Sequence, residues 1–118
     1  MILQRGKMRQ KKTQRGTNNR LPFRLNRARQ ILQTHLPVLH EHYGVRALWI
    51  FGSYVRGEQY QKSDLDLLVE FESPPSLFEF VRLERYLSDI LKVKVDLVMK
   101  SALKPAIGRH ILEEAQPI

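Results

Sequence analysis

Two aspartates, Asp64 and Asp66, stand two positions apart in the run Ser63-Asp-Leu-Asp-Leu-Leu-Val69. Side chains two residues apart on a β-strand point to the same face, so both carboxylates would lie on one side of a strand. Neighbouring carboxylates repel each other unless a cation lies between them. Carboxylate oxygens suit Mg²⁺ or Mn²⁺, which keeps coordination positions free for water and substrate phosphates. The pair therefore predicts a divalent metal site.

A third carboxylate, Asp96, lies between Val95 and Leu97 in a later apolar run. A lone aspartate in an apolar strand needs a partner, because burying it unpaired is unfavourable. If the two strands are neighbours in one sheet, Asp96 completes a cluster with Asp64 and Asp66. All three are then candidate catalytic residues and metal ligands.

A glycine-serine pair begins the segment Gly52-Ser-Tyr-Val-Arg-Gly57, which follows a third apolar run. Gly52 allows the backbone to approach a ligand closely, and Ser53 can open a helical turn whose N–H groups face an anion. Arg56, one turn later, adds a guanidinium that matches phosphate oxygens. These three residues are the predicted nucleotide-binding residues. A phosphate-binding turn that faces metal-binding carboxylates is typical of phosphoryl or nucleotidyl transfer.

The elements that must position these groups fit one domain, because 118 residues are within the usual size of a single domain. Leucine spacing predicts a helix that begins near Leu25, is kinked or interrupted at Pro37 and stops at Gly44. Ser76 and Glu79 have the spacing of a capping box at the start of another helix. The predicted order is helix, strand (45–51), strand (63–71), helix, strand (93–99) and helix (104–115). This order favours an α+β fold with a small mixed β-sheet and helices packed on it.

The positive charge is concentrated at one end of the chain. The net charge is +8, but residues 1–30 hold ten Lys and Arg and no Asp or Glu, so residues 31–118 carry 8 − 10 = −2. Such a stretch buries too little apolar surface to order itself, which predicts a disordered extension over residues 1–21 and a domain over residues 22–118. The extension is either a solvated tail or, over residues 5–29, an arm that binds nucleic acid or an acidic partner.

Composition excludes several classes of protein. The chain has no cysteine, which rules out disulfides, thiolate zinc sites and cysteine nucleophiles. No apolar run approaches the roughly 20 residues that span a bilayer. We therefore expect a cytoplasmic protein without membrane contact.

Three motifs together resemble the minimal nucleotidyltransferase (MNT) domains of the polymerase-beta-like superfamily. They are Gly52-Ser-Tyr-Val-Arg-Gly57, Ser63-Asp-Leu-Asp-Leu-Leu-Val69 and Val95-Asp-Leu-Val98, and the resemblance extends over residues 24–115. Each motif alone is weak, but three in this order with compatible elements form a specific set. The chain departs from the pattern at Val55, where relatives often have alanine.

The resemblance also implies roles for the predicted site residues. Gly52 and Ser53 would hold the triphosphate of a nucleotide, and Asp64 and Asp66 would bind two metal ions. Asp96 would complete the site and help to deprotonate the acceptor hydroxyl. Arg56 matches a motif arginine, and its contact with phosphate is inferred from its charge.

Many MNT domains are encoded beside a HEPN-domain ribonuclease toxin and transfer AMP from ATP onto a tyrosine of that partner. The resemblance thus implies an enzyme that acts as an antitoxin, with ATP as substrate. A chain of 118 residues has no room for a second domain that shapes an acceptor pocket, so we expect a docked protein to supply the acceptor. The alternative is a non-catalytic binding module that neutralises its partner by occlusion, with the basic tail binding nucleic acid.

Overall fold

The computed structural model describes residues 17–58 and 63–118, with side chains described from residue 24 onward. A long first helix is followed by strands and shorter helices. In chain order the elements are α2 (Thr17–Tyr43), β1 (Val45–Phe51), α3 (Ser53–Arg56), β2 (Leu65–Phe71), α4 (Leu77–Leu91), β3 (Val95–Met99), the 3₁₀ helix η1 (Lys100–Ala102), α5 (Pro105–Glu114) and β4 (Gln116–Pro117).

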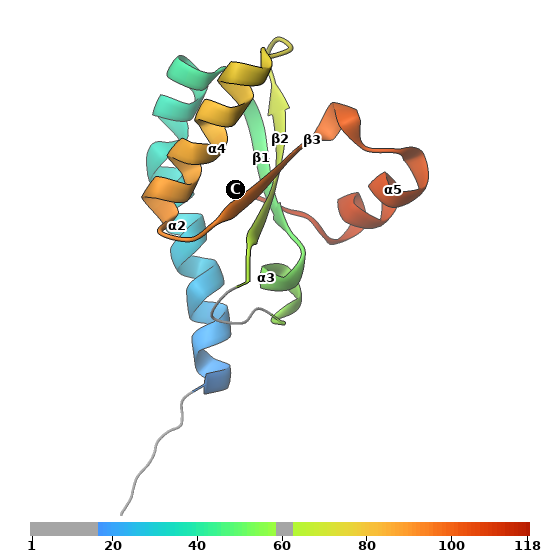
Figure 1. Ribbon diagram of the computed structural model, residues 1–118. Coiled ribbons are helices and arrows are strands. Elements are labelled where there is room, and N and C mark those ends of the chain that lie inside the picture. Colours follow the sequence, from blue (N-terminus) through green and yellow to red (C-terminus); the bar gives the residue numbers. More distant parts are fainter. Residues whose placement is uncertain (1–16, 59–62) are drawn as a thin grey trace, which may run out of the picture.

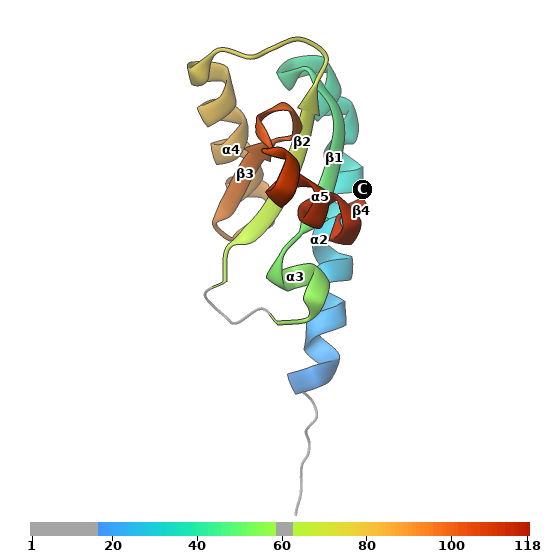
Figure 2. The same ribbon diagram turned by 90° about the vertical axis from the view of Figure 1, so that its right-hand side faces the viewer.

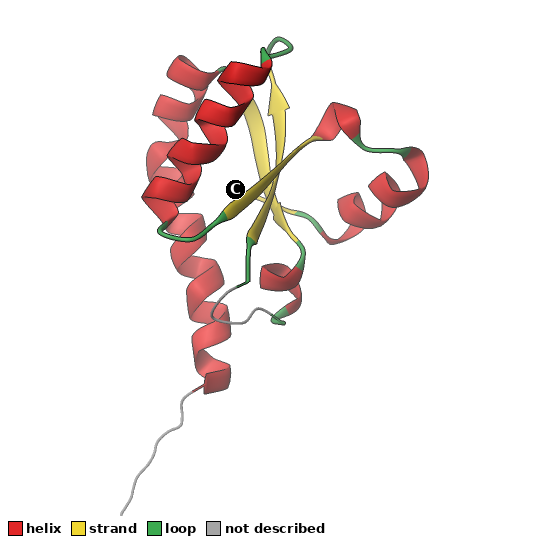
Figure 3. Cartoon of the chain, in the orientation of Figure 1, coloured by secondary structure: helices red, strands yellow, loops and turns green. Residues whose placement is uncertain are grey.

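The strands form one sheet in the order β3-β2-β1-β4. β1 is antiparallel to both β2 and β4, whereas β2 and β3 run parallel. Helices α2 and α4 lie side by side on one face of this sheet, and α5 lies on the other side (Figure 1). The same layers are seen when the chain is coloured by secondary structure (Figure 3). The α+β fold with a mixed sheet, predicted from the sequence, is confirmed.

The core lies between the sheet and the pair of helices α2 and α4. Alternate residues of β2 point into it, and they meet leucines of both helices; the fully buried members are Leu32, Leu39, Leu65, Leu67, Val69, Leu83 and Leu87. Burying one such side chain contributes roughly 1.5–3 kcal/mol. Because strand side chains alternate, the residues between them, among them Asp66, point to the opposite face of the sheet. The core thereby fixes which face carries the polar groups.

Side chains of α4 cover the outer edge of β3. The Val95 N–H donates to Ser88 Oγ at 3.0 Å, and the Leu97 N–H donates to Glu84 Oε2 at 3.0 Å. An edge strand otherwise presents unpaired N–H groups to solvent or to another chain. The start of α4 itself has the predicted capping box, since Ser76 and Glu79 each accept a backbone hydrogen bond from the other. These contacts fix the position of β3, the strand that carries Asp96.

The first helix differs from the prediction at two points. It runs through Pro37 as one helix, so of the two predicted outcomes, a kink or an interruption, the interruption is wrong. An interior proline disfavours a helix by about 3 kcal/mol, because it removes the hydrogen bond to the carbonyl four residues earlier. Here that carbonyl belongs to the exposed residue Gln33, where water can reach it, and Leu32 and Leu39 on either side are fully buried.

The helix also begins at Thr17 rather than near Leu25, so its backbone crosses the boundary expected at residue 22. Of the disordered extension predicted over residues 1–21, residues 17–21 belong to α2, and residues 1–16 lie outside those described. At the other end of α2 the predicted stop is present, because Gly44 has a positive φ of 67° directly after Tyr43. In the described part of the chain, no helix combines the length and apolar character needed to cross a membrane.

Candidate active site

The register of three strands brings two of the predicted carboxylates together. Asp66 is paired with Phe51 of β1 on one side and with Asp96 of β3 on the other. Neighbouring strands lie about 4.8 Å apart, and paired residues point to the same face. Asp66 and Asp96 are therefore adjacent on the face of the sheet opposite α2 and α4, at the end where β1 leads into α3 (Figure 1). The expectation that these two strands are neighbours is confirmed.

Asp66 lies in a region of concentrated negative charge. Its pKa is raised from 3.8 to about 6, first because burial disfavours the ionised form, and then because of the charges of Asp96 and Asp64. Arg56 opposes this rise in pKa, whereas Glu114 adds to it. A partly buried carboxylate that faces like charges is stabilised by a cation that enters between them. The electrostatics of the site thus suit a divalent ion.

Asp64 lies just before β2 rather than inside it, because the strand begins at Leu65. Its Oδ2 is 3.9 Å from the Nζ of Lys94, and both side chains are substantially exposed. Within the described residues, no three His, Asp or Glu side chains are close enough together to hold a metal ion without rearrangement. An exposed ion pair contributes little to stability, so breaking the pair between Asp64 and Lys94 has a low energetic cost.

Gly52 occupies a position that only glycine accommodates. Its φ of 81° and ψ of −152° lie in a region of backbone conformation essentially restricted to glycine. A Cβ atom built on Gly52 would lie 2.1 Å from Oδ2 of Asp66. The group that lies close to the Gly52 backbone is the side chain of a predicted metal ligand, and the predicted approach of a phosphate stays a prediction.

The short helix α3 begins directly after this glycine. The Gly52 carbonyl accepts hydrogen bonds from the N–H groups of Val55 at 3.0 Å and Arg56 at 3.2 Å, so the turn predicted at Ser53 is formed. Tyr54 anchors the turn in the core, where its side chain is 5% exposed. Burial raises the pKa of the Tyr54 hydroxyl, and the charge of Arg24 opposes this rise. Ser53 is half-buried at the start of the turn, next to Gly52.

Arg56 contacts two carboxylates of the chain itself. Its Nε donates to Glu58 Oε1 at 2.8 Å, and its Nη1 donates to the two carboxylate oxygens of Glu114 at 3.0 and 3.1 Å. These hydrogen bonds, that to Glu58 first, raise the pKa of Arg56. A contact between these two nitrogens and phosphate would have to replace or share the bonds to carboxylate. The phosphate-binding role of Arg56 stays a prediction.

Glu114 is the residue of this region that the sequence did not indicate. Besides Arg56, its Oε2 accepts a hydrogen bond of 2.8 Å from the N–H of Gly52. Glu114 is the last residue of α5, 62 positions away from Gly52. It follows another glutamate in a helix with no recognisable motif, so no local pattern distinguishes it. Figure 2 shows that α5 returns across the sheet. Only this return brings Glu114 to the turn.

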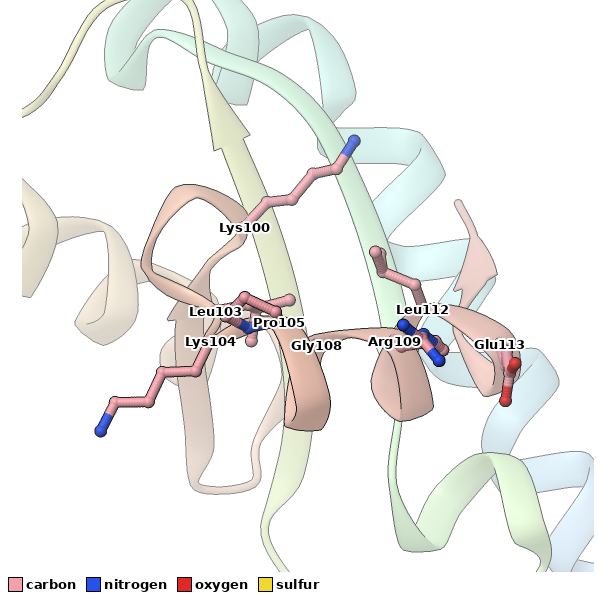
Figure 4. Close-up of a pocket in the computed structure, with 8 residues that line it drawn as sticks. All are labelled: Lys100, Leu103, Lys104, Pro105, Gly108, Arg109, Leu112 and Glu113. Atoms are coloured by element: carbon pink, nitrogen blue, oxygen red, sulfur yellow. The ribbon is translucent and has the colours of Figure 1, made fainter.

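A separate cavity of about 480 Å³ lies between η1 and α5. Figure 4 shows the residues that line this cavity. The charged ends of Lys100 and Lys104 point in different directions. None of the six predicted site residues lines this cavity. It therefore lies apart from the carboxylate cluster.

One basic residue of the predicted nucleic-acid arm, Arg29, makes a contact within the folded domain. Arg29 donates from Nη2 to Oε1 of Gln116, which ties α2 to β4. Arg24 and Arg27, in contrast, are exposed on α2. Residues 5–16 of the proposed arm lie outside the described residues, so nucleic-acid binding stays a prediction.

Comparison with known proteins places the chain in a family. Residues 26–118 match the family described as the nucleotidyltransferase domain. The protein adenylyltransferase MntA of Thermococcus cleftensis is 50% identical over 90 residues, which cover 76% of this chain and 91% of the relative. A solved structure provisionally described as a minimal nucleotidyltransferase is 33% identical, with a TM-score of 0.64, and the match covers 90% of this chain and all of the other.

The fold also matches a solved complex from Shewanella oneidensis, in which a tri-AMPylated HEPN toxin is bound to an MNT antitoxin. That match has a TM-score of 0.53 over 82% of this chain and 70% of the other, and at 18% identity it shows the fold alone. The family match, the identity to MntA and the paired carboxylates beside a glycine turn agree with one another. The chain belongs to the nucleotidyltransferase domain family and is a minimal nucleotidyltransferase similar to MntA.

Proposed function

We propose that this chain is a protein adenylyltransferase, which transfers AMP from ATP onto a hydroxyl group of a partner protein. The observation that carries the proposal is the pairing of Asp66 with Asp96 across β2 and β3, directly beside the turn at Gly52. In a nucleotidyl transfer, metal-binding carboxylates and a phosphate-binding turn must both reach one triphosphate. Here the side chain of Asp66 is within contact distance of the turn itself.

Asp64, Asp66 and Asp96 would hold two divalent ions, Mg²⁺ or Mn²⁺. Such ions, when bound, neutralise charge on the triphosphate and orient the reacting oxygens. The turn at Gly52 and Ser53 would bind the outer phosphates. It would thereby hold the α-phosphorus near the carboxylates.

The reaction has a simple balance of atoms. The oxygen of the acceptor hydroxyl bonds to the α-phosphorus of ATP, the bond from that phosphorus to the bridging oxygen breaks, and pyrophosphate leaves. The hydroxyl proton needs an acceptor, and Asp96 suits this role because it is exposed on the face of the sheet opposite α2 and α4. Positioning of the reacting groups and electrostatic stabilisation of the transition state would together account for the rate enhancement.

The acceptor we propose is a tyrosine of a HEPN-domain toxin, so that the transfer makes this chain an antitoxin. Two findings support the assignment: the 50% identity to the protein adenylyltransferase MntA, and the shared fold with the antitoxin bound to an AMPylated HEPN toxin. Asp96 is exposed and therefore accessible to a docked chain. A partner of this kind would bring its own hydroxyl to the site.

The test is the transfer of label from α-labelled ATP to a HEPN protein encoded beside this chain, in the presence of Mg²⁺. We expect label on the partner, and a loss of at least about a hundredfold for Asp64→Asn and Asp66→Asn, the usual scale for a key electrostatic group. A matched control is Asp89→Asn, because Asp89 is an exposed carboxylate on α4 away from the carboxylate cluster.

The alternative is neutralisation by occlusion, without chemistry. It predicts that the Asp64→Asn, Asp66→Asn double variant still silences the toxin although no label is transferred. Loss of both silencing and label in a folded double variant would instead establish the transferase. The two functions are thus separated by one pair of measurements on the same protein.

A further inference from the structure

We infer that Glu114 is a positioning residue, which holds the Gly52–Arg56 turn in the geometry that binds the triphosphate. The inference deepens the proposed function and rests on it. One carboxylate, on the last residue of α5, bonds to both ends of the turn: to the N–H of Gly52 at its start and to the guanidinium of Arg56 at its end.

The turn needs such a support because its own hydrogen bonds are few. α3 has four residues, and its internal hydrogen bonds are accepted by the carbonyls of Gly52 and Ser53. The buried side chain of Tyr54 fixes the middle of the turn. The Gly52 N–H and the Arg56 side chain lie outside this internal network, and Glu114 is the residue that bonds to both.

The burial of the contacts indicates that Glu114 contributes more than Glu58 does. Its side chain is 19% exposed, compared with 64% for Glu58, the other carboxylate that contacts Arg56. A charged hydrogen bond strengthens as solvent is excluded. In addition, the donor of the bond from Gly52 is a backbone N–H, whose position does not depend on a side-chain rotamer.

Gly52 connects this support to the carboxylate cluster. Its backbone N–H bonds to Glu114, and its Cα faces the carboxylate of Asp66 so closely that no Cβ would fit. Release of the Glu114 bond would let Gly52 shift relative to Asp66. Since a misplacement of about 1 Å can reduce a rate a hundredfold, Glu114 would affect nucleotide binding without touching the nucleotide.

The test compares Glu114→Gln with Glu114→Met in the full chain. Both variants are uncharged and similar in length, but only glutamine can still accept the hydrogen bonds from Gly52 and Arg56. We expect the dissociation constant for AMP-PNP, measured by calorimetry, to rise about tenfold in the Met variant and less than about threefold in the Gln variant. Glu113→Met, at the exposed neighbouring position, should leave the constant unchanged.

A second readout needs no nucleotide. Amide hydrogen exchange over residues 52–56 should be faster in the Met variant than in the Gln variant, while exchange in β2 stays the same. The inference is overturned if the Gln and Met variants bind AMP-PNP equally well and exchange alike. It is also overturned if either variant binds more tightly than the wild type, because the carboxylate would then be competing with phosphate.

If the Met variant does not fold, Glu114→Asp decides the question, because it keeps the charge but shortens the reach by one methylene group. Weaker AMP-PNP binding and faster exchange in the turn support the positioning role, and unchanged values overturn it. Failure of the wild-type protein to bind AMP-PNP would count against the proposed function instead. The exchange measurement would then still decide whether Glu114 holds the turn.

Discussion

Gly52, directly after β1, and Asp66 of β2 face each other so closely that a Cβ atom on Gly52 would lie 2.1 Å from Oδ2 of Asp66. The turn predicted to bind phosphate and the strand predicted to bind metal are thus in direct contact. A side chain added at Gly52 must displace the carboxylate of Asp66. Gly52 provides the most direct test of this coupling.

Gly52→Ala should destabilise the protein by about 2–4 kcal/mol, through backbone strain and overpacking against Asp66. It should also reduce AMP transfer at least about a hundredfold, because the Asp66 carboxylate must move. The control is Gly57→Ala at the other end of α3, where φ is also positive, at 71°, but no heavy atom lies within 4 Å of the new Cβ. That variant should lose only about 1–2 kcal/mol and keep its activity. Urea unfolding and label transfer measure both effects, and equal activities of the two variants would contradict the prediction.

The raised pKa of Asp66 predicts how the stability of the metal-free protein depends on pH. Between its ordinary value of 3.8 and about 6, the folded protein binds more protons at this site than the unfolded chain does. The contribution of Asp66 to the free energy of unfolding therefore falls as pH rises through this range. In EDTA, Asp66→Asn should gain about 1–2 kcal/mol relative to the wild type between pH 4 and pH 7, less than the full shift would give because the side chain is partly exposed. If the difference in the free energy of unfolding between Asp66→Asn and the wild type does not change with pH, the raised pKa of Asp66 is contradicted.

Divalent ions should favour the wild type over Asp66→Asn, which is the opposite of the effect expected in EDTA. At pH 8 we expect MgCl₂ together with AMP-PNP to raise the melting temperature of the wild type, since a ligand that binds only the folded state stabilises it. Asp66→Asn should lose most of that increase, although without metal it loses less stability than the wild type as the pH rises. Lys94→Met should keep the increase, because the Lys94–Asp64 pair is exposed and its loss frees Asp64. Differential scanning fluorimetry over a range of MgCl₂ concentrations would show both results.

The edge of β3 offers a test of what holds Asp96 in place. Glu84→Ala leaves the Leu97 N–H without its acceptor on α4 and should destabilise the protein by about 1–3 kcal/mol. Glu84→Gln retains an acceptor oxygen and should lose less than about 1 kcal/mol. Arg85→Ala, at the exposed neighbouring position, serves as the control and should change stability by less than about 0.5 kcal/mol. Chemical denaturation of the three variants measures how much stability each one loses.

The basic N-terminal segment is tested by removing residues 1–16, which precede α2. AMP transfer should be unchanged, because the predicted site residues all lie between residues 52 and 96. Binding to duplex DNA or RNA, measured by fluorescence anisotropy, should weaken and lose most of its dependence on salt. Equal affinity of the truncated and full chains for nucleic acid at each salt concentration would show that the segment is not a binding arm.

The sequence by itself determined the fold class and the three carboxylates. Alternation in β2 and β3 sets which side chains share a face, since the core takes Leu65, Leu67 and Leu97 and leaves the aspartates on the other side. The capping box at Ser76 and the stop at Gly44 depend on neighbouring residues alone, and both were predictable. Periodicity and capping are local properties, so the sequence carries them without the fold.

Tertiary structure decided the rest. The helix continues through Pro37 because the leucines on either side of it are buried in the core. The rule that a proline interrupts a helix considers only neighbouring residues and does not take this burial into account. The alignment of Asp66 with Asp96 depends on the parallel register of two strands 30 residues apart. Glu114 reaches Gly52 and Arg56 only because α5 returns across the sheet. Such contacts join distant parts of the chain, and their geometry follows from the packing of the whole domain rather than from any segment.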